Sequence, residues 1–122
     1  MRIAGFLLAI LCICMPVHAA QLPPAAEKEI SQLLAALGSS GCQFNRNGSW
    51  YKAADAQAHL TKKYDYLRKM EKLASTEDFI AMAGAQSSSS GQAYQVLCGT
   101  QPAMPSADWL NQQLRQLRAT TP

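Results

Sequence analysis

Three basic residues, Arg46, His59 and Lys63, have the types and spacing that suggest a binding site. Asp55, His59 and Lys63 follow one another at intervals of four, so on a helix they form one ridge. Arg46 directly precedes Asn-Gly, a strong hairpin signal, and a helix packed across that hairpin would bring it to His59. Arginine offers paired donors to a carboxylate or phosphate, and lysine adds a point charge. The spacing therefore predicts a small cationic patch of Arg46, His59 and Lys63 that binds an anionic group.

Histidine chemistry decides how such a patch responds to pH. With an ordinary pKa near 6.5, His59 would become charged as the pH falls toward about 6, and anion binding would tighten. The three side chains are expected on an exposed face, where substitutions change stability by no more than about 0.5 kcal/mol. The competing interpretation is the ordinary electrostatics of a solvated helix surface.

Catalytic arrangements have weaker support in the sequence, and no catalytic residue is assigned. A Ser-His-Asp triad would need His59, Asp55 and one of the serines 87–90, but no nucleophile-elbow sequence accompanies them. Carboxylate pairs for glycoside hydrolysis would come from acidic residues that polar helix faces and helix starts already explain. These acidic residues are Asp55, Asp65, Glu71, Glu77 and Asp78.

The cysteines predict one structural disulfide bond. Of the four cysteines, Cys12 and Cys14 fall in an apolar N-terminal segment, which leaves Cys42 and Cys98. An even count in an exported domain predicts a disulfide, and closing so long a loop stabilises a fold by about 4 kcal/mol in the chain-entropy model. With His59 the single histidine of the mature domain, too few ligands remain for zinc. No metal or other cofactor is expected.

The N-terminus has the three parts of a cleavable signal peptide. Arg2 supplies the positive start, an apolar run covers residues 3–17, and small residues precede the expected cleavage after Ala19. Cleavage after Ala20 is the alternative. Residues 1–19 are therefore expected to be removed on export to the periplasm.

Neither a membrane anchor nor nucleic-acid binding is expected of the mature protein. The apolar run is shorter than the roughly 20 residues of a membrane span. Leu11 and Ile13 stand before Cys12 and Cys14, where a lipoprotein signal has a small residue. The net charge of +3 is mild, whereas nucleic-acid binding calls for a basic patch and a pI above about 9.

Helical periodicity predicts four helices. The first begins at Pro24 and is expected to have Gly38 as its C-terminal cap. Ser75 and Asp78 resemble a capping box that starts the third helix, and Ser106 is expected to cap the fourth, which should fray from residue 119. The second helix is expected at about 53–73. Apolar residues on one side of each helix form the candidate core: Ala26, Ile30, Leu33, Leu34 and Leu37; Ala53, Ala56, Leu60, Tyr64 and Leu67; Phe79, Ile80, Met82 and Ala83; and Trp109, Leu110, Leu114 and Leu117.

Alternating apolar and polar residues predict a small antiparallel sheet. Residues 42–46 and 49–51 are expected to form a hairpin through Asn47-Gly48, because both turn residues tolerate positive φ. A third strand is expected at 93–98, and a Cys42–Cys98 bond would hold it beside the first strand.

Polar segments predict the loops, and the sum is an α+β fold. Residues 86–91 should form a flexible polar loop, and residues 99–105 a second loop. We expect one domain over residues 20–122, ordered from about 24 to 118. It should have about four helices packed around a small antiparallel sheet, a hairpin plus one strand, with one disulfide.

Three motifs taken together resemble a known family. They are a Phe-x-Arg-Asn-Gly turn at 44–48, an Ala-x-x-His-Leu-x-x-Lys segment at 56–63, and serines 87–90 followed by Gly91 and Tyr94. The pattern is similar to small exported bacterial proteins of the domain of unknown function 5329 family. The resemblance implies location in the periplasm of a Gram-negative bacterium, but the family has no established activity to carry over. The resemblance lends weight to six positions as ligand- or partner-binding residues and to two as turn residues. The binding positions are Arg46, His59, Lys63, Ser90, Gly91 and Tyr94, and the turn residues are Asn47 and Gly48.

Two classes of function follow from the sequence. The favoured one is a non-catalytic binding or interaction module that meets an envelope protein or a small anionic ligand. The alternative is a small periplasmic hydrolase with His59 as its general base. The missing nucleophile signature favours the module. A concave pocket converging on His59 would favour the hydrolase, and a flat surface would favour the module.

Overall fold

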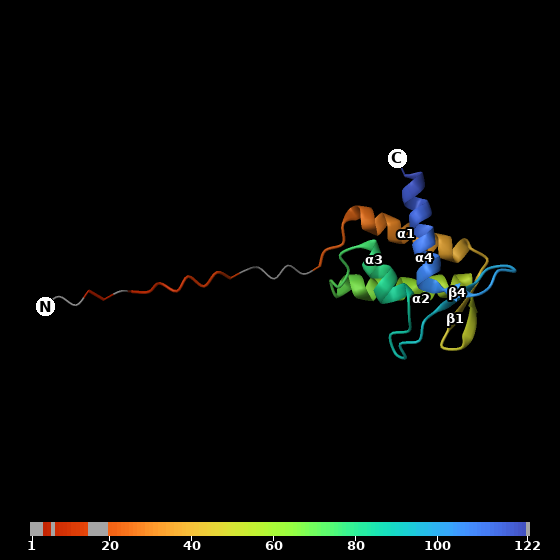
Figure 1. The fold of residues 1–122 in the computed structure, drawn as a ribbon, viewed down its shortest axis with the longest axis horizontal. Coiled ribbons are helices and arrows are strands. Elements are labelled where there is room, and N and C mark those ends of the chain that lie inside the picture. The colour runs from red at the N-terminus through yellow and green to blue at the C-terminus, as the bar shows by residue number, and fades with distance from the viewer. Residues whose placement is uncertain (1–3, 6, 15–19, 122) are drawn as a thin grey trace.

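A computed structural model of the chain describes residues 4–5, 7–14 and 20–121. The expected cleavage site at 17–19 lies outside the described residues. Residues 7–14 form no helix or strand and run away from the rest of the chain (Figure 1). Within the described ranges, no helix is long and apolar enough to cross a membrane.

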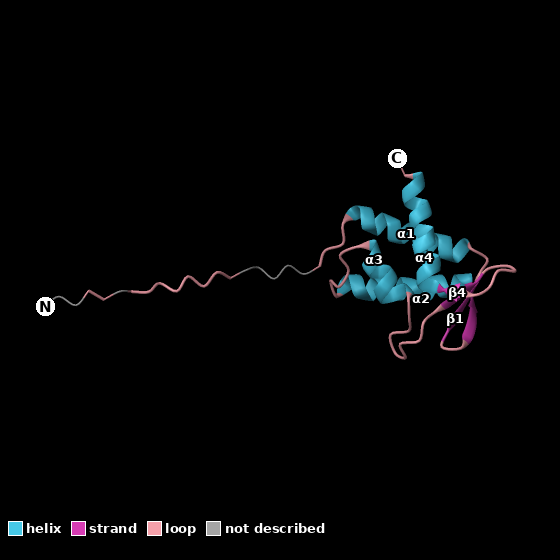
Figure 2. Cartoon of the chain, viewed as in Figure 1, coloured by secondary structure: helices cyan, strands magenta, loops and turns pink. Residues whose placement is uncertain are grey.

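Four helices surround the core (Figures 1 and 2), as the periodicity predicted. Helix α1 spans Pro24–Ser39, α2 spans Ala53–Lys69, α3 spans Thr76–Phe79 and α4 spans Ser106–Thr120. Helix α3 continues into a π-helical turn, η1, over Ile80–Gly84. Buried side chains come from all of these elements and from the sheet. The largest fully buried apolar ones are Phe79, Ile30, Leu33, Leu37, Leu73, Leu110 and Val96.

The sheet has four short antiparallel strands in the order β2-β1-β3-β4. Strands β1 (Gln43–Arg46) and β2 (Ser49–Lys52) form the predicted hairpin, and β3 covers Gln95–Leu97. Strand β4, Met104–Pro105, was expected to be a loop. It is too short to alternate and contains a proline, so sequence periodicity does not reveal it. The fold is α+β, with one strand more than predicted.

The strand register collects the sheet residues of the site on one face. Phe44 pairs with Tyr51 of β2 and with Val96 of β3, and side chains two residues apart on a strand share a face. Arg46 therefore lies on the same face as Phe44. The Trp109 ring of α4 meets Phe44 edge-on, with the ring centroids 5.9 Å apart. The helices thus pack on this inner face, and Arg46 points toward them.

The predicted disulfide between Cys42 and Cys98 is present, with a Cα–Cα distance of 4.4 Å. It joins the residue before β1 to the residue after β3, and these two strands pair antiparallel. The bond therefore holds the third strand beside the first, as the period-2 patterns required.

The C-terminal ends of α1, α2 and α4 differ from the predicted ends. Gly38 lies inside α1 rather than at its C-terminal cap, which is Ser40, and the end of the Gln57 side chain of α2 lies against it. Helix α2 ends at Lys69, four residues early, and Glu71 reverses the chain with φ 55. Helix α4 remains helical to Thr120, beyond the expected start of fraying.

The two predicted serine caps have opposite outcomes. The backbone N–H of Asp78 donates to Ser75 Oγ across 3.0 Å, which confirms the start of α3. Ser106, by contrast, is the first residue of α4 and its side chain makes no capping hydrogen bond. Its hydroxyl is free for another role.

The serine-rich segment is a polar loop, but it is tied to the hairpin. Ser87 is buried, and its backbone N–H donates to Gln92 O across 2.9 Å. Asn47 Nδ2 donates to Ser87 Oγ across 3.3 Å, and Ser90 Oγ donates to Asn47 Oδ1. The predicted polar loop is present, and the Asn47 side chain hydrogen-bonds it to the hairpin turn.

Candidate functional site

The centre of the site is a hydrogen bond between strand β1 and helix α2. Arg46 Nη1 lies 2.6 Å from His59 Nδ1 and 3.2 Å from Nε2. A guanidinium only donates, and a neutral imidazole accepts at one nitrogen. The guanidinium therefore donates to an unprotonated nitrogen of the His59 ring. The predicted meeting of Arg46 and His59 is confirmed.

Tyr94 extends this contact to Lys63. His59 Nε2 lies 3.1 Å from Tyr94 Oη and shares a hydrogen bond with it. Lys63 Nζ donates to the same oxygen across 3.4 Å and to the backbone carbonyl of Gln86 across 3.0 Å. A chain of polar contacts thus runs Arg46–His59–Tyr94–Lys63. We call these four residues the polar chain.

Burial and positive neighbours keep His59 neutral. Burial and, to a smaller extent, the charges of Arg46 and Lys63 lower the pKa of His59 below its ordinary value. Burial also lowers the pKa of Lys63 and raises that of Tyr94. The expectation of an unperturbed His59 is therefore wrong. The ring is therefore harder to protonate than an unperturbed histidine, and charging it needs a lower pH than the sequence suggested.

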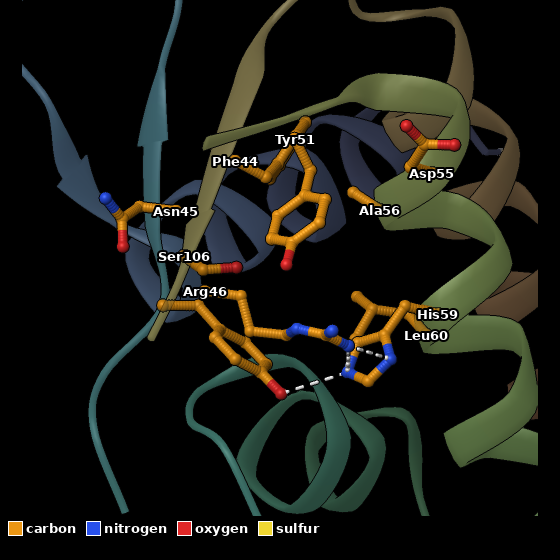
Figure 3. A pocket seen from close by; sticks show the side chains of 10 residues that line it. Phe44, Asn45, Arg46, Tyr51, Asp55, Ala56, His59, Leu60 and Ser106 are labelled. Carbon is orange, nitrogen blue, oxygen red and sulfur yellow. Dashed lines mark hydrogen bonds between the residues drawn. The ribbon is translucent and has the colours of Figure 1, made fainter. Parts of the chain in front are cut away.

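A cavity of about 310 Å³ opens between the hairpin, α2 and the start of α4. We call it the Arg46 cavity. Figure 3 shows the Arg46 side chain reaching to His59 along one side of it, and the Tyr51 ring crossing it from the sheet. Its lining comes from four strands and helices: Phe44, Asn45 and Arg46 of β1; Tyr51 of β2; Asp55, Ala56, His59 and Leu60 of α2; Ser106 of α4; and, beside β3, Tyr94.

Two hydroxyl groups in this lining lack protein partners. Ser106 is only 2% exposed, and Figure 3 shows its oxygen directed into the cavity. The Tyr51 hydroxyl points toward the Arg46–His59 pair in the same view. Neither hydroxyl hydrogen-bonds to any of the residues that the structure describes. Sequence reasoning missed both: Ser106 was interpreted as a helix cap, and the pairing of Tyr51 with Phe44 was the available signal.

The remaining predicted site residues lie around the cavity rather than in it. Asp55 stands at the rim. Lys63 lines a separate hollow on the other side of His59, together with Met82. Gly91 has φ 73 and, with Ser90, shapes the loop that ends at Tyr94. The residues of the predicted patch therefore do not share one surface. Arg46 lines the cavity, and Lys63 lines the separate hollow.

The Ser-His-Asp triad is not assembled among the residues that the structure describes. Neither Asp55 nor any of the serines 87–90 hydrogen-bonds to His59 among the described residues, whereas Ser87 and Ser90 are bonded to Asn47. In the same part of the chain, no cluster of three or more His, Cys, Asp or Glu residues has metal-binding geometry. The chemistry that the site offers is hydrogen bonding and charge.

Comparisons with known proteins identify a family whose function is unknown. The sequence profile of a family of unknown function (DUF5329) matches residues 24–118, which includes the hairpin, α2 and α4. The comparisons with curated proteins and with solved structures give no match.

Proposed function

Because the chain belongs to the DUF5329 family of unknown function, the site must carry the functional argument, and we propose that the protein is a non-catalytic module that binds a small anionic ligand in the Arg46 cavity. A flat docking surface for a protein partner is the less favoured form of this module, since the cationic group lies in a cavity. The volume of about 310 Å³ is at the lower end of small-molecule sites.

The observation that supports this proposal is how the Arg46 charge is held. Among the described residues, Arg68 and Arg118 pair with glutamates, while Arg46 makes no ion pair. Its partner is a neutral ring, and its guanidinium carbon lies 5.0 Å from the centroid of the Tyr51 ring. These contacts orient the guanidinium without cancelling its charge. An anionic ligand would supply the missing counter-charge with bidentate geometry.

Export to the periplasm is part of the same proposal. The signal-peptide pattern of residues 1–19 supports it. The Cys42–Cys98 disulfide is also typical of an oxidising compartment.

A titration of the purified mature protein tests anion binding. Acetate, benzoate, sulfate and phosphate are added while backbone amide shifts are followed by NMR, and we expect shifts at residues 44–46, 51 and 106. Arg46→Gln should abolish them. Arg115→Gln, an equal charge change on an exposed residue of α4, should bind like the wild type. Equal binding by both variants, or binding of no anion at millimolar concentration, contradicts the proposal.

The hydrolase with His59 as general base remains the second candidate, because the cavity does converge on His59. Against it, both nitrogens of the ring already have hydrogen-bond partners in Arg46 and Tyr94, so a substrate would have to displace one of them to reach a lone pair of the ring. Assays of p-nitrophenyl esters with wild type and His59→Gln separate the candidates. Turnover that disappears in His59→Gln would favour the hydrolase.

A further inference from the structure

The geometry points to a ligand class: a monocarboxylate with an apolar, ring-sized body, bound with its carboxylate at Arg46, Tyr51 and Ser106. This inference rests on the proposed function and narrows it from anions in general to one kind of anion. Three independent features of the cavity support it: its charge, its unpartnered donors and its apolar wall.

The charge of the cavity fits a single negative charge. Arg46 is the cation that lines it, since Lys63 lines the opposite hollow and is bonded to Gln86 and Tyr94. Asp55 at the rim adds a negative charge of its own. One negative charge on a ligand can pair with Arg46, whereas a second one, as on a phosphate dianion, would have no cation of the lining to pair with and would be repelled by Asp55. Unpaired charge in a partly buried site is costly. A carboxylate brings one charge.

The donors of the cavity fit a planar pair of oxygens. Nη1 of Arg46 is used by His59, which leaves the other guanidinium N–H groups for a carboxylate, the shape that an arginine fork matches best. The Ser106 residue is 2% exposed, and its oxygen points into the cavity, where a ligand can reach it. The Tyr51 hydroxyl also points toward the Arg46–His59 pair. The Ser106 and Tyr51 hydroxyls thus offer two further donors to an acceptor in the cavity.

The rest of the wall fits an apolar body. Phe44, Ala56 and Leu60 face the cavity from β1 and α2, and Phe44 and Leu60 belong to the buried core. The Tyr51 ring crosses the cavity from the sheet side. These groups offer no hydrogen bonds to a sugar or a peptide, but they bury the face of a ring. The volume of about 310 Å³ also limits the ligand to about the size of one substituted ring.

Calorimetric titration with matched probes tests the inference. Benzoate should bind at least about tenfold more tightly than acetate, because the ring buries apolar surface. It should also bind at least about tenfold more tightly than benzamide, which has the same shape without the charge. Phenyl phosphate and inorganic phosphate should bind more weakly than benzoate. Ser106→Ala should weaken benzoate binding about fivefold, whereas Ser31→Ala, on an exposed position of α1, should leave it unchanged.

A second variant guards against misfolding as an explanation. Ala56→Leu extends a side chain of α2 into the cavity and should abolish benzoate binding, while circular dichroism and the amide spectrum away from the site remain those of the wild type. Unchanged benzoate affinity in this variant or in Ser106→Ala would overturn the assigned position of the ligand.

The probes distinguish failure of this inference from failure of the proposed function. If phenyl phosphate binds more tightly than benzoate and Arg46→Gln abolishes its binding, the monocarboxylate is wrong but anion binding stands. If benzamide equals benzoate, the cavity takes neutral rings and both proposals fail. Both also fail if none of the probes binds.

Discussion

Arg46 and His59 are joined by a hydrogen bond of 2.6 Å between Nη1 and Nδ1, across 13 residues of sequence and two different elements. The bond holds a permanently charged group with a neutral one, so its strength does not come from cancelling charge. Positioning and charge are thereby separated: the imidazole fixes the direction of the guanidinium, and the charge stays available to a ligand. Each partner is half-buried, which makes the contact worth measuring on its own.

A double-mutant cycle measures the Arg46–His59 contact. Arg46→Gln, His59→Leu and the double variant should reveal a coupling of about 1 kcal/mol, in the range of partly buried hydrogen bonds. Each single substitution should therefore cost more than the roughly 0.5 kcal/mol expected for free surface residues. Urea unfolding gives the four free energies. A coupling below about 0.3 kcal/mol would mean that the contact contributes little to the fold.

Stability should fall as the pH drops from about 7 to 6. The unfolded chain protonates His59 near the ordinary pKa of about 6.5, whereas burial and neighbouring cations lower the pKa of His59 in the folded chain. The unfolded state therefore binds more protons in this range, and the free energy of unfolding decreases as the pH falls. Urea unfolding from pH 7.5 to 5.5 measures the slope.

His59→Gln is the control for this pH dependence, because glutamine keeps an amide for hydrogen bonding but does not titrate. The slope should flatten in this variant. Glu29 and Glu77, whose pKa values are lowered mainly by hydrogen bonds from Arg118, lose stability only in more acidic solution, so they do not interfere. An identical slope in wild type and His59→Gln would contradict the lowered pKa of His59.

Removal of the disulfide should cost about 4 kcal/mol in the chain-entropy model, since the bond closes a loop with a sequence separation of 56. Cys42→Ala/Cys98→Ala can be compared with the oxidised wild type by thermal unfolding. Labelling of the unfolded, non-reduced mature protein with a thiol reagent should find no free cysteine. Two reactive thiols per mature chain would contradict the bond.

Gly84→Ala should destabilise the fold by about 1–3 kcal/mol. A β-carbon at Gly84 in η1 would overlap Leu110 Cδ1, which is buried in the core. Gly38→Ala is the matched control, because the new methyl group meets the movable end of the Gln57 side chain and alanine favours a helix by about 1 kcal/mol. Denaturation midpoints should fall for Gly84→Ala and change little or rise for Gly38→Ala. The reverse order would contradict the close packing of η1 on α4.

The mature protein is expected to begin at Ala20 or Gln21. Expression with the natural N-terminus and intact-mass measurement of the exported product tests this prediction. A mass that retains residues 1–19, or a diacylglycerol adduct on Cys12 or Cys14, would contradict the signal-peptide interpretation.

Local patterns predicted most of the fold, because they reflect interactions between residues close in sequence. The Asn47-Gly48 turn, with φ values of 52 and 85, follows from backbone sterics alone. The α2 ridge follows from a spacing of four, and together these two placed Arg46 beside His59. The pairing of Cys42 with Cys98 followed from counting, because no other cysteines remained in the mature domain.

Features that depend on tertiary packing were missed. Strand β4 exists because β3 completes its hydrogen bonds, and the π-helical turn η1 packs on α4; no local pattern shows either. Ser106 has the residue type and position of a helix cap, and only the placement of α4 beside the hairpin shows that its hydroxyl faces a cavity. The lowered pKa of His59 likewise depends on burial, which a single sequence does not give.

The Cys42–Cys98 bond has a consequence for a chain that is cut by a protease. Arg46, Tyr51, His59 and Tyr94 all lie between the two cysteines. The exposed serine loop at 88–91 lies there too. A single cleavage in that loop would therefore open a covalent ring rather than release a fragment. The nicked protein would remain one molecule, with strand β1 still fastened to β3 and most of the cavity wall held together.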